Sequence, residues 1–226
     1  MSTLPSSDVN PSVNIGALRR DYSHQTLLES DAEATPFLQF QHWFIQAINA
    51  QVIEPNAMTL ATITTEGKPA ARIVLLKDFD ERGFVFYSNF QSRKGQELAQ
   101  TPAAALVFWW GELERQVRIE GAISIVSEAE ADAYFQSRPR GSQLGAWVSN
   151  QSQVITDRSV LEDRLTQLEQ DYKNAPIPRP SHWGGYRLVP TYFEFWQGRS
   201  NRLHDRLCYR HAVSSSNAWQ IERLSP

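Results

Sequence analysis

The sequence has little of what a secreted or membrane-spanning protein needs. Its 226 residues contain one cysteine, Cys208, which excludes a disulfide within the chain, and no cysteines or clustered histidines stand at metal-binding spacing. The longest apolar runs, such as residues 103–110, are far shorter than the roughly 20 residues that a transmembrane helix requires. We therefore interpret Cys208 as a small buried apolar residue, and we predict no membrane span and no metal site.

A strong charge of either sign is also missing. The formal net charge is −3 and the pI is about 6.0, so no global electrostatic attraction to nucleic acid is expected. The first 22 residues show neither the basic start and apolar stretch of a secretory signal nor the Arg-rich pattern of a transit peptide. We therefore expect a cytoplasmic protein that binds neither nucleic acid nor membrane.

What is present is the composition of a folded domain. Hydrophobic residues make up 41% and charged residues 21% of the chain, and its length suits one domain with a sizeable core. Residues 1–14 are rich in Ser, Pro and Asn with few apolar anchors, so we expect a mobile N-terminal tail. Residues 15–226 then form a single domain.

Hydrophobic periodicity predicts one helix followed by a series of strands. Thr35 and Pro36 supply a helix cap and a first-turn proline, and the amphipathic helix that follows should end near Pro55. From Ala57 onwards the apolar residues have the spacing and composition of strands, interrupted by a short helix over 92–101. The expected strands run from Ala57 to a turn at Glu66-Gly67, and then over 71–79, 83–89, 103–110 and 113–126.

The second half of the chain predicts two helices and three further strands. Ser127 and Glu130 form a capping box that should start a helix stopped by Pro139, and a more polar helix should cover 157–172. After a PIPRPSHWGG loop, residues 192–196, 207–211 and 219–224 have strand-like content. Such a meander favours an antiparallel barrel over a parallel sheet, so we predict a mainly β fold with flanking helices, of the α+β class.

Three stretches combine cations and hydrogen-bonding side chains with aromatic or strand-forming residues, a composition suited to a planar anionic ligand. The first runs from RIVLLK at 72–77 through Tyr87 and Ser88 to Ser92-Arg93-Lys94, where a helix should begin. The backbone amides of a helix N-terminus, with Arg93 and Lys94, would make a phosphate cradle. The alternative, favoured by composition alone, is that these cations are strand-end charges and an exposed helix turn.

The second stretch is SRPRGSQLGAWVSNQS at 137–152. Its amides, hydroxyls and arginines surround an apolar AWV segment, a mixture that a plain surface loop rarely needs. We therefore expect a loop that folds against a ligand or a partner subunit.

The third stretch is FWQGRSNRLHDR at 195–206. Trp196 could stack on a ring, and in an extended backbone Arg202, His204 and Arg206 would share one face toward a negatively charged ligand. The alternative for His204 is a structural pairing with Asp205 or another carboxylate. Both interpretations stay open at this point.

Taken together, these motifs resemble those of the pyridoxamine 5′-phosphate oxidase family. The family's order and spacing are matched by RIVLLK, SRK, LERQVRIEG, SRPRGSQLGAWVSNQS, HWGG, FWQG and RLHDR, and the similarity runs from about Leu18 to the C-terminus. A departure is Ser88, where many relatives have threonine. The resemblance implies an FMN-binding split β-barrel that works as a homodimer, with two FMN molecules in clefts at the subunit interface.

The resemblance also implies a reaction and its residues. Pyridoxamine 5′-phosphate and pyridoxine 5′-phosphate would be oxidised by O2 to pyridoxal 5′-phosphate, with release of H2O2 and, from the amine, NH3. Arg202 and His204 would be catalytic and lie nearest the reacting carbon. FMN would be bound by Arg72, Ile73, Val74, Leu75, Leu76, Lys77, Tyr87, Ser88, Arg93, Lys94, Gln116, Gln151, Ser152, Trp196 and Arg206. Substrate would be bound by Lys77, Tyr134, Arg138, Ser142, Arg202 and His204, under a lid formed by Arg19, Arg20, Asp21 and Tyr22.

Three other interpretations remain. Two keep the split barrel: a reductase that uses FMN or a deazaflavin on another substrate, and a non-catalytic protein that binds flavin, haem or pyridoxal phosphate. Fold alone does not choose among these, whereas peroxide release from pyridoxamine 5′-phosphate would. The third, nucleic-acid binding through aromatic and Arg-rich strands, needs a basic field that a net charge of −3 does not supply.

Overall fold

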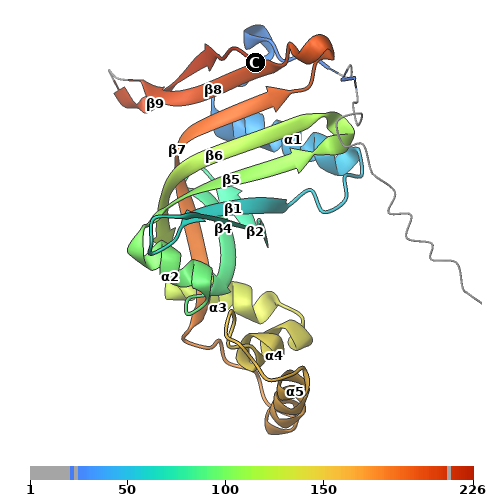
Figure 1. The fold of residues 1–226 in the computed structure, drawn as a ribbon, viewed down its shortest axis with the longest axis vertical. Coiled ribbons are helices and arrows are strands. Elements are labelled where there is room, and N and C mark those ends of the chain that lie inside the picture. Colours follow the sequence, from blue (N-terminus) through green and yellow to red (C-terminus); the bar gives the residue numbers. More distant parts are fainter. Residues whose placement is uncertain (1–20, 23–24, 213–214) are drawn as a thin grey trace, which may run out of the picture.

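The computed structural model describes residues 21–22, 25–212 and 215–226 (Figure 1). Its centre is a nine-stranded antiparallel sheet in the order β2-β1-β5-β6-β7-β4-β3, with β8 beside β7 and β9 beside β8. The strands are β1 (Ala57–Ile63), β2 (Pro69–Leu75), β3 (Asp78–Asp80), β4 (Gly83–Asn89), β5 (Ala103–Trp110), β6 (Arg115–Ile125), β7 (Trp183–Gln197), β8 (Asp205–Ala212) and β9 (Ser215–Arg223). The predicted fold class, mainly β and antiparallel with flanking helices, is confirmed.

Strand β7 organises the sheet because three other strands pair with it. Its first half, from Trp183 to Leu188, pairs with β4, and its second half, from Tyr192 to Gln197, pairs with β8, while β6 follows both halves. The register of β6 shifts between Glu120 and Gly121, where β7 changes partner. A Cβ on Gly121 would lie 2.1 Å from the carbonyl oxygen of Val189, so a glycine is needed for this close approach. The sheet therefore branches at β7, with β4 and β8 paired to its two halves.

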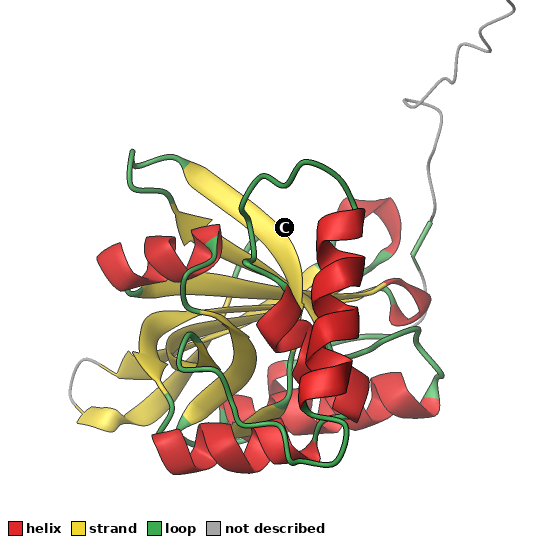
Figure 2. Ribbon diagram, turned by 90° about the horizontal axis from the view of Figure 1, so that it is seen from below, coloured by secondary structure: helices red, strands yellow, loops and turns green. Residues whose placement is uncertain are grey.

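Five α-helices flank the sheet in the part of the chain that the structure describes. They are α1 (Pro36–Asn49), α2 (Arg93–Gln100), α3 (Glu128–Ser137), α4 (Arg140–Val148) and α5 (Ser159–Asp171), and short 3-10 turns cover η2 (Glu29–Asp31), η3 (Gly111–Leu113) and η4 (Ser200–Arg202). None of these described helices is long and apolar enough to cross a bilayer. Figure 1 shows α3, α4 and α5 at the end of the molecule opposite β8 and β9, and Figure 2 looks onto the end that carries these helices.

The main core lies between α1 and the sheet. Phe40 of α1 is fully buried and packs its ring against Phe84 of β4 and Phe108 of β5, with centroids 4.9 and 5.1 Å away. A second, smaller cluster joins Phe135 of α3 and Leu144 of α4 to Trp183 at the start of β7. This cluster fixes the helical end of the molecule on the sheet. Cys208, as expected, is fully buried.

The predicted capping residues are confirmed, whereas some element boundaries are not. Thr35 Oγ1 accepts the Leu38 amide at 3.3 Å, and Ser127 Oγ accepts the Glu130 amide at 3.2 Å. Helix α1 ends at Asn49 and not near Pro55, because the chain turns at once through left-handed residues, with φ values of 55° at Gln51 and 47° at Glu54.

Three expectations about the local backbone are wrong. The stretch 137–152 is not a loop, because residues 140–148 form α4, whose Leu144 packs against the cluster around Trp183. The backbone around Arg202 is not extended, because η4 places Asn201 and Arg202 in left-handed conformations with φ values of 54° and 62°. Arg202 therefore does not alternate with His204 and Arg206 along one strand. In addition, β7 begins inside the expected PIPRPSHWGG loop.

Candidate active site

A cavity of about 430 Å³ lies between β2, β4 and helices α2 to α4. The lining comes from the RIVLLK segment, β4, the start of α2, α3, the SRPRGSQLGAWVSNQS stretch with α4, and Trp183 at the start of β7. Residues predicted from sequence that line it are Ile73, Val74, Leu75, Lys77, Tyr87, Ser88, Lys94, Tyr134, Arg138, Ser142 and Gln151. The cavity thus brings together residues assigned separately to cofactor and to substrate.

Lys94 is the centre of a polar cluster on one wall of this cavity. Its Nζ donates to Gln151 Oε1 at 2.6 Å and to Ser88 Oγ at 3.1 Å, and Ser88 is itself buried. Burial and then the neighbouring charge of Arg72 lower the pKa of Lys94 from its usual value. At the rim, the Arg93 amide donates to Ser152 Oγ at 3.2 Å. A cation, hydroxyls and amides therefore converge at the start of α2, as an anion site requires.

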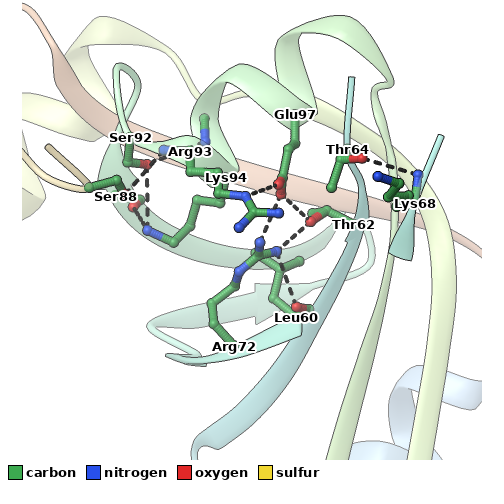
Figure 3. Close-up of polar contacts among 12 residues, drawn as sticks. Leu60, Thr62, Thr64, Lys68, Arg72, Ser88, Ser92, Arg93, Lys94 and Glu97 are labelled. Carbon is green, nitrogen blue, oxygen red and sulfur yellow. Dashed lines mark hydrogen bonds and ion pairs between the residues drawn. The ribbon is translucent and has the colours of Figure 1, made fainter. Parts of the chain in front are cut away.

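Below this cluster a buried carboxylate, Glu97 of α2, holds two arginines (Figure 3). Glu97 Oε2 accepts from Arg72 Nη2 at 2.8 Å, and Oε1 accepts from Arg93 Nε at 3.0 Å. Thr62 Oγ1 donates to Oε2 at 2.6 Å and also accepts a hydrogen bond from Arg72. Arg72, which was predicted to bind the cofactor together with the rest of RIVLLK, is held in this network and is not among the residues that line the cavity.

The cavity lining also includes aromatic rings and the guanidinium of Arg138, one nitrogen of which has no hydrogen-bond partner among the described residues. Tyr87 and Tyr134 stack with centroids 3.9 Å apart, and Tyr87 also stacks on Trp183 at 5.3 Å. The Arg138 guanidinium lies 4.5 Å from the centre of the Trp183 ring. Its Nη1 is buried and has no hydrogen-bond partner among the described residues. Burial lowers the pKa of Arg138. A buried donor without an acceptor is costly, and an anionic ligand in the cavity would satisfy it.

A second group of predicted residues gathers near the other end of β7. The ring of His204 lies 4.5 Å from that of Trp196, and Tyr22 contacts both rings at 5.9 Å. His204 Nδ1 accepts the Arg199 amide at 3.1 Å, which leaves the proton of the neutral ring on Nε2. Burial and next the charge of Arg202 lower the pKa of His204. The described contacts thus favour a neutral imidazole held by backbone over the carboxylate pairing considered as the alternative.

Arg206 belongs to this group through its neighbour on β7. It is paired in register with Trp196, and its Nε donates to the buried carboxylate of Glu194 at 2.8 Å. Arg118 donates to the other oxygen of Glu194 at 2.6 Å. Gln116 of β6 lies directly across from Trp196 on the opposite side of β7.

The two groups do not share a cavity within one chain. Trp183 lines the cavity, whereas Trp196 stands thirteen residues further along the same strand, which at about 3.3 Å per residue is a path of roughly 40 Å. None of the second group is among the residues that line the cavity. Within the described residues, the second group therefore does not contribute to the lining of this cavity.

The remaining predicted residues lie elsewhere. Leu76 is buried in the core. Of the four residues predicted as a lid, Arg19 and Arg20 fall outside the described residues, Asp21 is exposed, and Tyr22 contacts Trp196 and His204. Sequence reasoning gave no role to several residues that do line the cavity, namely Asn89, Gly145, Ala146, Ser149 and Trp183. Trp183 belongs to the HWGG motif, but the sequence did not predict that Trp183 packs against Phe135 of α3.

Two family models match this chain. The model described as "Pyridoxamine 5′-phosphate oxidase" matches residues 44–171, and the one described as "Pyridoxine 5′-phosphate oxidase C-terminal dimerisation region" matches residues 183–226. The chain belongs to the pyridoxamine 5′-phosphate oxidase family. Trp196, His204 and Arg206 of the second group lie within the residues that the dimerisation-region model matches, whereas Tyr22 and Gln116 lie outside them.

Family members of high similarity cover nearly the whole chain. A protein of Acaryochloris marina named "Pyridoxine/pyridoxamine 5′-phosphate oxidase" is 64% identical over 213 residues, which are 94% of this chain and 96% of that protein. A protein of the same name from Cyanothece sp. is 63% identical over 95% of this chain and 99% of its own length.

Solved structures show the same fold. PhzG from Burkholderia lata, crystallised with tetrahydrophenazine-1-carboxylic acid, has a TM-score of 0.82 at 32% identity and covers 89% of this chain and 98% of its own. A family-related FMN binding protein from Nostoc punctiforme has a TM-score of 0.67 at 18% identity, over 86% of this chain and 100% of its own. The second likeness concerns the fold alone.

Proposed function

We propose that this protein is an FMN-dependent oxidase that makes pyridoxal 5′-phosphate. Pyridoxamine 5′-phosphate, O2 and water give pyridoxal 5′-phosphate, NH3 and H2O2, and pyridoxine 5′-phosphate and O2 give pyridoxal 5′-phosphate and H2O2. Two relatives that carry this activity in their names are 64% and 63% identical over nearly the full chain. The chain has one cysteine, which is buried and free, and this is compatible with the reducing environment of the cytoplasm, where we propose that the enzyme acts.

The observation that carries the proposal is the shared cavity. The residues predicted for the cofactor, such as Lys94 and Gln151, and those predicted for the substrate, such as Arg138 and Ser142, line one space of about 430 Å³. Ligand pockets of small molecules commonly have volumes of roughly 300–1,000 Å³. Two phosphate-bearing ligands need two sets of cations, and the cavity has Lys94 on one wall and Arg138 on the other.

The residues present fit FMN. Lys94, Ser88 and Gln151 would hold its phosphate at the start of α2, where Arg93 is adjacent, and β2 residues Ile73 to Leu75 would support its ring. FMN, when bound, takes two electrons from the substrate carbon and passes them to dioxygen. The unpaired Nη1 of Arg138 would bind the substrate phosphate and so fix the substrate ring in the cavity.

Arg202 and His204 would complete the site from the second group. His204 is held by the Arg199 amide and by Trp196, so its Nε2 proton is available to orient the substrate or to move during the reaction. Arg202 is exposed and carries its charge beside His204, so it is free to contact an anionic substrate. Because these residues follow the C-terminal end of β7, whereas Trp183 at its start lines the cavity, they would act on the cavity of a partner subunit in a homodimer.

A different substrate on the same fold is the second candidate, since PhzG was crystallised with a tetrahydrophenazine carboxylic acid. The two cationic walls of the present cavity favour a substrate with its own phosphate. At 32% identity, PhzG is also much less similar to this chain than the cyanobacterial relatives.

The test is a direct assay of the purified protein. Loaded with FMN, it should be yellow and convert pyridoxamine 5′-phosphate in air to a product with the absorbance of pyridoxal 5′-phosphate, with one H2O2 formed per turnover. The same sample without oxygen should make at most one product per FMN. A protein that stays colourless with FMN, or that makes no pyridoxal 5′-phosphate, would contradict the proposal.

A further inference from the structure

We infer that Glu97 is a positioning residue, the internal counter-ion that keeps Arg72 and Arg93 in place for the phosphate of the flavin. This inference rests on the proposed function, because it assumes that the anion bound beside Lys94 is the FMN phosphate. Neither the motifs nor the cavity lining includes Glu97, which lies one turn into α2 beneath the cluster.

Geometry places Glu97 between the cations. Its side chain is 2% exposed, and its two oxygens accept from different arginines, one on β2 and one at the first residue of α2 (Figure 3). The donation from Thr62 at 2.6 Å fixes the carboxylate against β1. The carboxylate therefore connects the strand that contains RIVLLK to the helix that begins at SRK. Arg72 and Glu97 are 25 residues apart in the sequence.

Charge explains why such a carboxylate is needed. Arg72, Arg93 and Lys94 bring three positive charges together, and the charge of Arg72 already lowers the pKa of Lys94, whereas Glu97 acts in the opposite direction. Burial raises the pKa of Glu97, but the hydrogen bonds from Thr62 and Arg72 outweigh it and keep the carboxyl ionised. With Glu97 the cluster has a net charge of +2, which matches the roughly −2 charge of a phosphate monoester at neutral pH.

Without Glu97 the arginines would lose their common acceptor. Arg93 is mostly exposed, so it would turn toward solvent, and Arg72 would be left with Thr62 and the Leu60 carbonyl. The loss should affect a phosphate at the start of α2 and not the flavin ring. Affinity for FMN relative to riboflavin, which lacks the phosphate, is therefore the quantity that separates positioning from general damage to the fold.

The experiment measures the dissociation constants of FMN and riboflavin for the apoprotein by flavin fluorescence, in the wild type, Glu97→Gln and Glu97→Ala. Glutamine keeps the shape but offers one acceptor oxygen, so we expect FMN affinity to fall about tenfold in E97Q and further in E97A, with riboflavin affinity changed less than twofold. Asp80→Asn is the matched control, because Asp80 also holds two arginines, Arg82 and Arg187, outside the cavity. It should leave the FMN-to-riboflavin ratio unchanged.

Each outcome decides the inference. An unchanged or increased preference for FMN in E97Q, or an equal loss for both flavins, would overturn it. If E97A does not fold, E97Q still gives the ratio, since it preserves volume and one hydrogen bond. A wild-type protein that binds FMN no better than riboflavin would contradict the phosphate cradle itself, and thus the proposed function.

Discussion

At the scale of single residues, the charged side chains of the site differ in whether they have a partner of opposite charge. Glu97 and Glu194 are buried and each accepts from two arginines, whereas Arg138 has a buried nitrogen without a described acceptor. Two arginines that share a buried carboxylate are held in place by it, whereas the buried nitrogen of Arg138 needs an acceptor that an anionic ligand would supply. The carboxylates therefore position the cations, and the cations would contact the ligand.

Arg202→Ala should weaken substrate use far more than FMN retention. Arg202 lies beside His204 and is exposed, so a charge-assisted contact to an anionic substrate would be lost without disturbing the core. Such contacts contribute about 1.5–3 kcal/mol, so kcat/KM should fall by roughly 10- to 100-fold. Steady-state kinetics and flavin content of the purified variant measure the two effects, and unchanged kinetics would remove Arg202 from the site.

Glu194 should make stability depend on pH in the acid range. Burial raises its pKa, but hydrogen bonds from Arg206 and Arg118 outweigh burial and hold the pKa below its usual value of 4.5. The unfolded chain therefore binds the proton first, and the stability contributed by Glu194 is complete above pH 4.5 and lost as the pH falls through the folded-state pKa.

Denaturant unfolding of wild type and Glu194→Gln at several pH values tests this. The difference in unfolding free energy should be largest at pH 7 and should shrink below pH 4.5. The exposed pair of Glu66 and Lys68 provides the control, since Glu66→Gln should change the unfolding free energy little at any pH. A difference that stays constant down to pH 3 would show that the ion pairs of Glu194 do not form in solution.

At the scale of elements, helix α2 positions the cations of the cavity. Ser92 caps it: the hydroxyl accepts the Gly95 amide at 3.3 Å and donates to the Asn89 carbonyl at 2.7 Å, and the residue is fully buried. The cap fixes the first turn, on which Arg93 and Lys94 stand. A change at the cap should therefore reach the ligand through the backbone.

Ser92→Ala should lower both the unfolding free energy, by about 1–2 kcal/mol, and the affinity for FMN. Thr35→Ala removes the equivalent cap of α1, remote from the cavity, so it should cost a comparable unfolding free energy without changing FMN affinity. Urea unfolding and flavin titration of both variants give the comparison. Equal FMN affinities in the two variants would mean that the α2 cap serves stability alone.

At the scale of the whole molecule, the geometry divides the site between the two ends of β7. Residues around Trp183 line the cavity and residues around Trp196 do not, and the latter fall in the family's dimerisation region. We propose that residues 15–226 act as one domain, in which each subunit supplies one cavity and one second group. The homodimer would then hold two equivalent sites.

Subunit exchange tests this division. Arg138→Ala and Arg202→Ala homodimers should each be weakly active, but a mixed dimer has one site with both changes and one with neither. After exchange, activity should recover to about a quarter of the wild-type value, because half of the dimers are mixed and each has one intact site. No recovery, in a sample whose mixed dimers are shown by mass spectrometry, would mean that both arginines act within one chain.

Sequence determined the elements because their signals are local. Capping at Thr35 and Ser127, the helix start at Ser92 and the alternation in β6 depend on residues a few positions apart, and the structure confirms them. The long motifs likewise identified the family and most residues of the cavity. Sequence reasoning failed at α4 and at Arg202. Helix α4 is stabilised by the burial of Leu144 beside Trp183, and Arg202 lies in a left-handed turn, and no local sequence pattern predicts either feature.

Only the tertiary structure showed which of the predicted site residues line the cavity and which lie in the second group. Alternation along an extended backbone predicted Arg202, His204 and Arg206 on one face, and the resemblance implied clefts at a subunit interface. The structure shows that Trp196 and His204 are not among the residues that line the cavity, to which Trp183 at the start of β7 contributes. Tertiary structure also showed that Glu97, absent from every motif, lies between Arg72 and Arg93. Residue spacing specifies neighbours along a helix or strand, whereas distances between elements depend on packing of the whole sheet, and charge balance depends on those distances.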